Sequence, residues 1–449
     1  MTLSRDIELG DECQTPLSRL TQLAQEDQAR RFYSIAHFLT VRALYEAFRG
    51  LRKDASAGVD KLTYGEYQKG LGQNLQNLWQ RVKSGEYRSL PLRRIYIPKD
   101  DGKKVRPISI PALEDKIVQA AMVRLLNAIY EVDFRPCSFG SRPGRNAHQA
   151  LDEIDRIIFR NSITHVLELD ITSYFDSIVR KRLMEMIERR INDGGILKLI
   201  GKWINVGIIE EGRLLETEEG VGQGQVISPF LANVYLHHVL DQWFEDEVQP
   251  RLRGKAFLVR YMDDAVICFQ NEQDAQKVHE VLDKRFSKYG LRLYPDKTRL
   301  VEFGYSALTK AERHGTKPDT FDFLGFTHIT ARSRRGKFMV TTKTMKKRLL
   351  RGLKGVSAWC KEHRHLSITD QHTTLNAKLR GHYQYYGRSS NHRSLRKFYS
   401  AVRRIWKMWL NRRSRNNTLD WDTYAKLLQR YPLSPPRITH SWASLRSPA

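Results

Sequence analysis

Apolar residues recur at helical spacing near the start of the chain and then change to a hairpin pattern. Residues 18–50 predict helical structure that ends at Gly50. Its apolar positions are Leu20, Leu23, Phe38, Val41, Leu44 and Phe48. Residues 85–111 predict a β-hairpin, because apolar residues flank an Asp-Gly turn on both sides. These residues are Ile95, Ile97, Val105, Ile108 and Ile110. A helix is expected over 112–132.

Between residues 160 and 330 the pattern alternates between short apolar strands and amphipathic helices. A strand over 164–171 is followed by a helix, a glycine-rich stretch and a second helix. The segment FLVRYMDDAVICF then predicts two strands around a tight turn, and a further helix ends at Gly290 before another strand. This order predicts a small antiparallel sheet with helices backing one face.

Three aspartates fall where these predicted strands end. Asp170 closes the first strand, and Asp263 and Asp264 occupy the turn of the strand pair. Clustered carboxylates are costly to bury, but two Mg²⁺ ions can neutralise them and clamp the attacking and leaving oxygens of a phosphoryl transfer. Asp-Asp in a turn also has a local explanation, because Asp tolerates the left-handed conformation. The dipeptide alone leaves both interpretations open.

Composition and charge narrow the choice of partner. The 449 residues are enough for two or three domains, and 41% hydrophobic with 28% charged residues is an ordinary globular balance. Lys and Arg number 76 against 50 Asp and Glu, for a net charge of +26. Such a field favours a polyanion, so nucleic acid is the first partner to consider.

Nearly all of the excess charge lies in residues 331–449, which hold 28 Lys and Arg but only four acidic residues. A solvated, disordered charge run is one explanation. The segment nevertheless keeps apolar residues at helical spacing, which a disordered tail does not need. They are Leu349, Leu350, Leu353, Val356 and Trp359, and then Phe398, Val402, Ile405, Trp406 and Trp409. We therefore expect a folded helical domain with a basic face.

Neither the four cysteines nor the N-terminal residues indicate an exported protein or a membrane protein. No two cysteines form a C-x-x-C pair, so neither a zinc knuckle nor a disulfide framework is predicted. The first residues lack an apolar signal core, and no window approaches the ~20 apolar residues of a membrane span. A reducing cytoplasm is the expected location.

Taken in order, the motifs resemble those of the reverse transcriptases encoded by bacterial group II introns. IPKDDGKKVRPISIP is similar to that family's fingers hairpin, and LELDITSYFDSI to its first catalytic motif. SFGSRPGRNAHQAL lies between these two, and the remaining motifs follow in the family's order: GQGQVISPFLANVYL, RYMDDAVICF, PDKT, FDFLGF and LRGHYQYYG. Met262 and Gln225 depart from the usual alanine and glycine, so template contacts or fidelity are expected to differ.

The resemblance implies a site for two Mg²⁺ ions, with Mn²⁺ as a substitute. Asp170, Asp263 and Asp264 would be the catalytic metal carboxylates, and the carbonyl of Ile171 a further ligand. Lys99 and Arg106 would contact the incoming triphosphate. A phosphate-binding surface for the template is the alternative, harder to exclude for Lys103 and Lys104.

Three further residues receive substrate roles from the resemblance. Gln223, between Gly222 and Gly224, would position the nucleotide sugar and base. Phe175 would block a ribose 2′-hydroxyl; a core position is the alternative, because Phe175 and Tyr174 alternate faces and one of them should be buried. Lys297 would either donate a proton to pyrophosphate or pair with a phosphate.

The resulting expectation is an α+β right-hand polymerase. We expect an N-terminal helical extension over 1–54, fingers and an antiparallel palm over 55–330, and an all-helical basic thumb or maturase domain over 331–449. The family implies RNA-templated DNA synthesis from deoxynucleoside triphosphates on a DNA primer, with group II intron RNA binding, splicing assistance and intron mobility. After RYPLSPPRITH nine residues remain, without the family's HNH nuclease motif, so no endonuclease activity is expected.

Several alternatives to an intron-encoded enzyme stay open. One is a domesticated enzyme of DNA repair, phage defence or CRISPR spacer acquisition. Another is a non-catalytic RNA-binding splicing factor, which the intact aspartates disfavour. Whether the chain forms a homodimer is likewise open.

Overall fold

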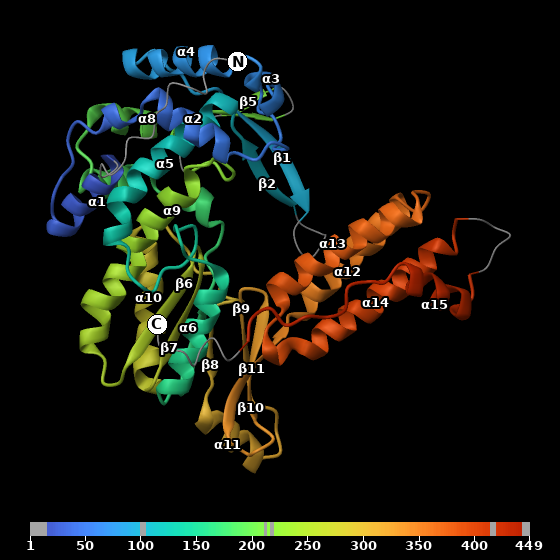
Figure 1. The fold of residues 1–449 in the computed structure, drawn as a ribbon. Coiled ribbons are helices and arrows are strands. Elements are labelled where there is room, and N and C mark those ends of the chain that lie inside the picture. The colour runs from blue at the N-terminus through green and yellow to red at the C-terminus, as the bar shows by residue number, and fades with distance from the viewer. Residues whose placement is uncertain (1–15, 99–104, 211–212, 216–219, 414–418, 442–449) are drawn as a thin grey trace.

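We describe the fold from a computed structural model, covering residues 16–98, 105–210, 213–215, 220–413 and 419–441 (Figure 1). The N-terminal part combines helices with a four-stranded sheet of order β2-β1-β4-β5. The strands are β1 (Leu92–Pro98), β2 (Val105–Ile110), β4 (Ile208–Glu210) and β5 (Arg213–Leu215). The helices are α1 (Pro16–Glu26), α2 (Val41–Gly50), α3 (Tyr64–Gln68), α4 (Leu71–Ser84), α5 (Leu113–Asp133) and α8 (Gly194–Ile204).

The predicted hairpin is confirmed, because β1 and β2 pair antiparallel with Ile95 opposite Ile108. The prediction of helical structure across 18–50 is wrong in its middle. Between α1 and α2 the chain is irregular, with a short 3₁₀ turn (Ala36–Phe38). The Phe32 amide donates to the Arg190 carbonyl at 2.7 Å, and the Phe32 carbonyl accepts from the Asn192 amide at 2.8 Å. A partner distant in sequence thus outweighs the local helical preference.

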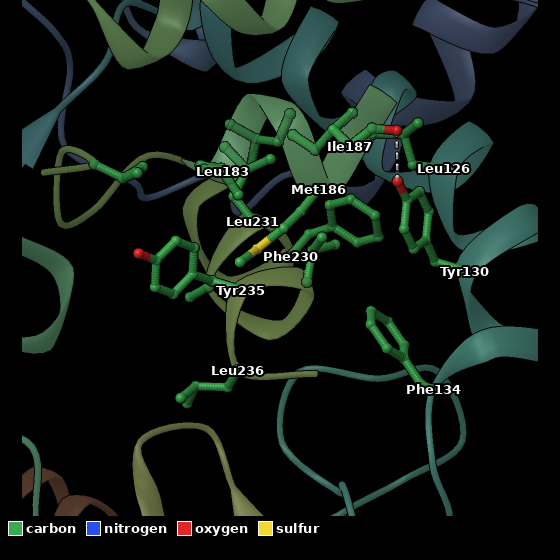
Figure 2. Packing of buried hydrophobic residues seen from close by; sticks show 14 of the residues in the cluster. Leu126, Tyr130, Phe134, Leu183, Met186, Ile187, Phe230, Leu231, Tyr235 and Leu236 are labelled. Atoms are coloured by element: carbon green, nitrogen blue, oxygen red, sulfur yellow. Dashed lines mark hydrogen bonds between the residues drawn. The ribbon is translucent and has the colours of Figure 1, made fainter. Parts of the chain in front are cut away.

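A single buried cluster joins the N-terminal helices to the rest of this part of the chain. Leu20 and Leu44, on either side of that break, lie in the same cluster as α5 and the sheet residue Leu167. Figure 2 shows its centre, where the Tyr130 hydroxyl of α5 donates to the Ile187 carbonyl of α7 (Arg180–Glu188) at 3.2 Å. The core therefore continues across the domain boundary predicted at residue 54.

The second sheet has the order β6-β7-β3-β8, and all its neighbouring strands are antiparallel. The strands are β3 (His165–Leu169), β6 (Ala256–Tyr261), β7 (Asp264–Phe269) and β8 (Arg299–Glu302). Leu167 and Ile267 pack on the side of α9 (Ser228–Leu236) and α10 (Glu272–Lys288). Val166 and Val266 face α6 (Ala147–Arg160). Helices thus cover both faces rather than the predicted one, because the strands are apolar on both sides.

A three-stranded sheet and four long helices complete the chain. The sheet has the order β11-β10-β9 and follows α11 (Tyr305–Arg313). Its strands are β9 (Thr320–Phe323), β10 (Phe326–Arg332) and β11 (Phe338–Thr344). The expectation of an all-helical region from residue 331 is therefore wrong at its start, since the alternating pattern of β11 pairs it with β10.

The predicted helices after residue 345 are present and share a core of their own. They are α12 (Lys346–Glu362), α13 (Ile368–Tyr386), α14 (His392–Leu410) and α15 (Trp421–Arg430). Val356 of α12 and Phe398, Val402 and Trp406 of α14 are buried together, as their spacing predicted. Figure 1 shows these helices extending to one side of the second sheet.

Polar contacts join this helical part to α6, which covers the second sheet, and to the three-stranded sheet. The Arg388 guanidinium, just after α13, is buried and pairs with Asp152 at 2.8 Å and Asp155 at 2.7 Å on α6. The Tyr385 hydroxyl donates to the Leu324 carbonyl at 2.9 Å, in the turn between β9 and β10. Across the described ranges, the helices are too short or too polar to cross a membrane.

His328 on β10 predicts a measurable pH dependence of stability. The ring is buried and stacked on Phe321 with centroids 4.5 Å apart, and burial lowers its pKa to about 3. An unfolded histidine titrates near ~6.5, so only the unfolded chain binds this proton at mildly acidic pH. The free energy of unfolding should therefore fall below about pH 6.5, by up to about 1.4 kcal/mol per pH unit from this residue.

His328→Phe keeps the stacked ring and should remove that part of the slope. Urea unfolding at about pH 7.5 and about pH 5 measures it. His314→Phe, at an exposed position, is the control and should keep the wild-type pH dependence. An unaltered slope in His328→Phe would contradict the assignment.

Candidate active site

Strand register brings the three predicted aspartates to one edge of the second sheet. Leu169, the last residue of β3, lies opposite Ala265 of β7, and Tyr261 of β6 lies opposite Asp264. Asp170 follows β3 directly, Asp263 lies in the turn between β6 and β7, and Asp264 begins β7. The predicted convergence is therefore present, and it depends on pairing between segments about 95 residues apart.

The turn that carries two of the aspartates has an unusual backbone. Met262 has φ +57°, which is left-handed and uncommon for a residue other than glycine. A Cβ atom at Gly140 would lie 2.5 Å from the Met262 nitrogen and 2.7 Å from its Cγ. Glycine at 140 therefore leaves room for the turn, including the methionine side chain that departs from the usual alanine.

The carboxylates at this edge repel one another. Partial burial raises the pKa of Asp263, and the charge of Asp170 adds to the rise. Asp264 keeps some contact with solvent, but the surrounding protein and the charges of Asp263 and Asp170 raise its pKa to about 6. Clustered acids with raised pKa values are typical of sites that bind a cation.

Cations from three parts of the chain offset this repulsion. Arg106 of β2 lowers the pKa of Asp263, and Arg348 of α12 and Lys297 lower that of Asp264. The Lys297 ammonium also donates to the Asp170 carboxylate at 2.8 Å. The β1–β2 hairpin, the segment before β8 and the helix α12 thus all direct positive charge toward one edge.

The donor set suits Mg²⁺, but one ligand is engaged elsewhere. Oxygen ligands from carboxylates are those that Mg²⁺ prefers. Among the described residues, no three His, Cys, Asp or Glu side chains lie close enough to hold a metal ion together, and Asp170 is bound to Lys297. Metal binding would therefore require Asp170 to exchange the ammonium for the ion. The roles of the aspartates and of the Ile171 carbonyl as metal ligands stay predictions.

Backbone pairing explains why Lys297 lies beside Asp170. The Tyr294 amide donates to the Asp170 carbonyl at 2.8 Å, and the Thr172 amide donates to the Arg292 carbonyl at 2.9 Å. Ile171 itself faces Leu293 in this bridge, and its side chain is buried. The segment that carries Lys297 is thereby held along the end of β3.

The two aromatic residues after Asp170 occupy different environments. Tyr174 is buried, and its hydroxyl donates to the Ala232 carbonyl of α9 at 2.6 Å. Phe175 is half-buried at the edge of the same core. Tyr174 is therefore the core residue of the pair, which leaves Phe175 as the aromatic that could face a nucleotide.

The glycine-rich loop is fastened to the fingers hairpin. The Ser109 amide of β2 donates to the Gln223 carbonyl at 2.7 Å, and a Cβ atom at Gly224 would lie 2.6 Å from the Ser109 carbonyl oxygen. Behind this loop is a cavity of about 310 Å³, lined by both hairpin strands and by Asp176, Arg180 and Gln223. Lys99, Lys103 and Lys104 fall outside the described residues.

Gln225, the second departure from the family pattern, is buried. Its side chain accepts from Gln119 at 2.8 Å and donates to the Trp203 carbonyl at 3.0 Å. The expectation that template contacts or fidelity differ at this position stays a prediction, and the amide is turned into the core. Any effect on the template must pass through the loop that carries it.

A buried polar network, which was not predicted from the sequence, lies behind the aspartates. Its centre is Arg260 of β6, whose guanidinium is fully buried and pairs with Asp241. The only signal for it was a single arginine within the apolar strand FLVRYM. A charge in such a strand must find buried partners, because an unpaired one would be too costly.

A four-stranded antiparallel sheet with three aspartates at one edge, facing a cationic hairpin, defines the palm of a template-directed polymerase. Residues 97–328 match the reverse transcriptase (RNA-dependent DNA polymerase) family, so the chain belongs to that family and is an RNA-directed DNA polymerase. The predicted resemblance to group II intron reverse transcriptases is confirmed by the relatives described next.

Three relatives give the extent of the likeness. The chain is 34% identical to protein YkfC of Escherichia coli over 318 residues, which is 64% of this chain and 79% of YkfC. It is 29% identical over 280 residues to the group II intron-encoded protein LtrA of Lactococcus lactis, covering 60% of this chain and 46% of LtrA. An uncharacterised 91 kDa protein in a Schizosaccharomyces pombe cob intron is 40% identical over 174 residues, 38% of this chain and 21% of that protein.

Phe175→Ala should relax sugar selection, because removing the ring opens space for a 2′-hydroxyl beside the nucleotide. The measurement compares ribonucleotide with deoxynucleotide incorporation in single-nucleotide extension. Tyr174→Phe is the matched control, since it removes only a hydroxyl bound to the Ala232 carbonyl. Unchanged discrimination in folded Phe175→Ala would assign Phe175 a packing role instead.

Proposed function

We propose that this protein extends a DNA primer on an RNA template, using two Mg²⁺ ions held by Asp170, Asp263 and Asp264. The observation that carries the proposal is the meeting of these carboxylates at one sheet edge, with cations directed at them from three elements. When bound, the ions would activate the primer hydroxyl and stabilise the leaving pyrophosphate. Mn²⁺ is expected to substitute.

The remaining site residues bind and orient the nucleotide. Arg106 faces the aspartate edge from the hairpin and would hold the triphosphate through its forked guanidinium. Gln223, fastened to the same hairpin, would position the sugar and base, while Phe175 would exclude a 2′-hydroxyl. Once released from Asp170, Lys297 would pair with a phosphate or protonate pyrophosphate.

The nucleic acid would leave the site along α12. Arg348 near the start of this helix acts on Asp264, so the helix begins beside the catalytic edge. Lys347, Arg351 and Lys354 are exposed at positions i, i+4 and i+7, which places them on one helical face. This basic stripe on α12 (Lys347, Arg351 and Lys354) would follow the phosphate backbone of a template–primer duplex.

We further propose that the chain binds a group II intron RNA and assists its splicing. The support is its likeness to a group II intron-encoded protein and the strongly basic residues 331–449. Splicing of an intron precursor at limiting Mg²⁺, with and without the protein, tests this. Acceleration by both wild type and Asp263→Asn would separate splicing assistance from polymerisation. No acceleration, with polymerisation intact, would favour a domesticated enzyme in repair, phage defence or CRISPR spacer acquisition.

Asp263→Asn should abolish primer extension, because it removes a negatively charged oxygen that would bind the metal ion. RNA affinity should stay nearly unchanged, because most of the basic residues, in 331–449, are left intact. Primer extension on an RNA template and RNA binding by fluorescence anisotropy measure the two quantities. Asp283→Asn, on the exposed side of α10, is the matched control and should extend primers normally. Near wild-type extension by Asp263→Asn would refute the metal assignment.

Neutralising the basic stripe on α12 should weaken nucleic-acid binding and its salt dependence. Each phosphate contact contributes a slope of roughly −0.7 to −0.9 in log K against log salt, so the triple Gln variant of Lys347, Arg351 and Lys354 should flatten the slope by about 2. The matched control replaces Lys277, Lys284 and Lys288, exposed on α10, with Gln. Equal slopes in both variants would place the duplex elsewhere.

A further inference from the structure

The buried Arg260 side chain uses its full donor capacity on four residues. Its Nε and Nη2 atoms donate to Asp241 at 2.8 and 2.5 Å. Nη2 also donates to the Ser138 hydroxyl at 2.8 Å, and Nη1 donates to the Asn233 side-chain carbonyl at 2.9 Å. The last contact runs from Nη1 to the backbone carbonyl of Met262 at 3.0 Å. Five N–H groups therefore meet five acceptors.

The partners of Arg260 are themselves fixed in place. Asp241 ends a π-helical stretch (His237–Asp241) that continues α9, a local irregularity that often occurs at functional sites. The side-chain amide nitrogen of Asn233 donates to the Gly140 backbone carbonyl at 2.7 Å. The backbone of Arg260 also pairs with that of Ser138. The Arg260 backbone amide donates to the Cys137 carbonyl at 2.8 Å, and the Arg260 carbonyl accepts from the Phe139 backbone amide at 2.9 Å.

This network ends on the catalytic turn. The Met262 carbonyl belongs to the peptide unit that leads into Asp263, so holding it fixes the orientation of that peptide plane. Met262 is also in the left-handed region at φ +57°, a conformation that persists only where surrounding contacts enforce it. Gly140 closes the other side, since a Cβ atom there would touch the Met262 nitrogen.

We propose that Arg260 is a positioning residue for catalysis, which holds the Met262 carbonyl and thereby sets the direction of Asp263 and Asp264 toward the metal ions. The inference rests on the proposed metal site. Arg260 touches neither nucleotide nor metal; it acts through the backbone of the turn. A lysine in its place could keep the charge pair with Asp241 but has too few donors to reach the remaining acceptors.

The test must separate positioning from simple stabilisation. Removing one member of a buried ion pair leaves an uncompensated charge, whereas replacing both by apolar residues of similar size is often neutral. The Arg260→Met/Asp241→Leu double variant should therefore fold while leaving the Met262 carbonyl unheld. The matched control is Arg190→Met/Asp133→Leu, a second buried pair at 2.8 Å, whose arginine holds the carbonyls of Asp27, Gln28 and Arg30 instead.

Three measurements are made on each full-length variant: thermal unfolding, Mn²⁺ binding by electron paramagnetic resonance, and kcat and KM for single-nucleotide extension. For Arg260→Met/Asp241→Leu we expect native-like unfolding, Mn²⁺ affinity lowered about tenfold and kcat lowered about 100-fold with little change in KM. The Arg190 control should keep wild-type Mn²⁺ affinity and kcat. Wild-type values in the folded Arg260 double variant would overturn the proposal.

Two single variants keep the proposal testable if the double variant does not fold. Arg260→Lys retains the charge pair, and Gly140→Ala replaces none of the Arg260 partners but would bring a Cβ atom to 2.5 Å from the Met262 nitrogen. Both should lower Mn²⁺ affinity and kcat together, and either one folded with wild-type values would refute the proposal. If wild type binds Mn²⁺ but extends no primer, the proposed function fails, while Mn²⁺ binding still tests Arg260.

Discussion

The antiparallel register of β3 against β7 is the constraint on which the site depends. Because Leu169 faces Ala265, the end of one strand meets the beginning of the other, and the three aspartates share one edge. A slip of one residue would turn every side chain of β3 to the opposite face and exchange the residues that contact α10 with those that contact α6. The apolar cover on both faces therefore fixes the register, and the register fixes the catalytic edge.

The repulsion at this edge explains why separate parts of the chain meet there. Three neighbouring carboxylates are unfavourable together, and the raised pKa values of Asp263 and Asp264 reflect burial as well as repulsion between the carboxylates. Arg106 from the hairpin, Lys297 from the palm and Arg348 from α12 each reduce it. Under the proposed function, a triphosphate and a nucleic-acid backbone would bring further negative charge to this edge, and the same cations would offset it.

Local pattern was sufficient for the β1–β2 hairpin and for the helices after residue 345, because both follow from periodicity. The meeting of Asp170 with Asp263 joins distant segments, but the order of the predicted elements was enough to anticipate it. The features that the sequence did not predict depend on pairing between distant residues. The backbone of Phe32, for example, pairs with residues near Ile191, and this pairing interrupts the helix predicted over 18–50. The acceptors of Arg260 are four residues, most of them distant in sequence, so one arginine in an apolar strand could signal the need for partners but not identify them.

The buried contact of Arg388 with Asp152 and Asp155 has a consequence for exchanging parts between related enzymes. The arginine belongs to the helical C-terminal part, whereas both acids belong to α6. A chimaera that took only one of these parts would bury a charge without its counterion, at a cost of several kcal/mol. Residues 346–441 are therefore not a freely transplantable module. A graft with a different RNA preference would need to carry α6 with it, or to recreate the ion pair at the new junction.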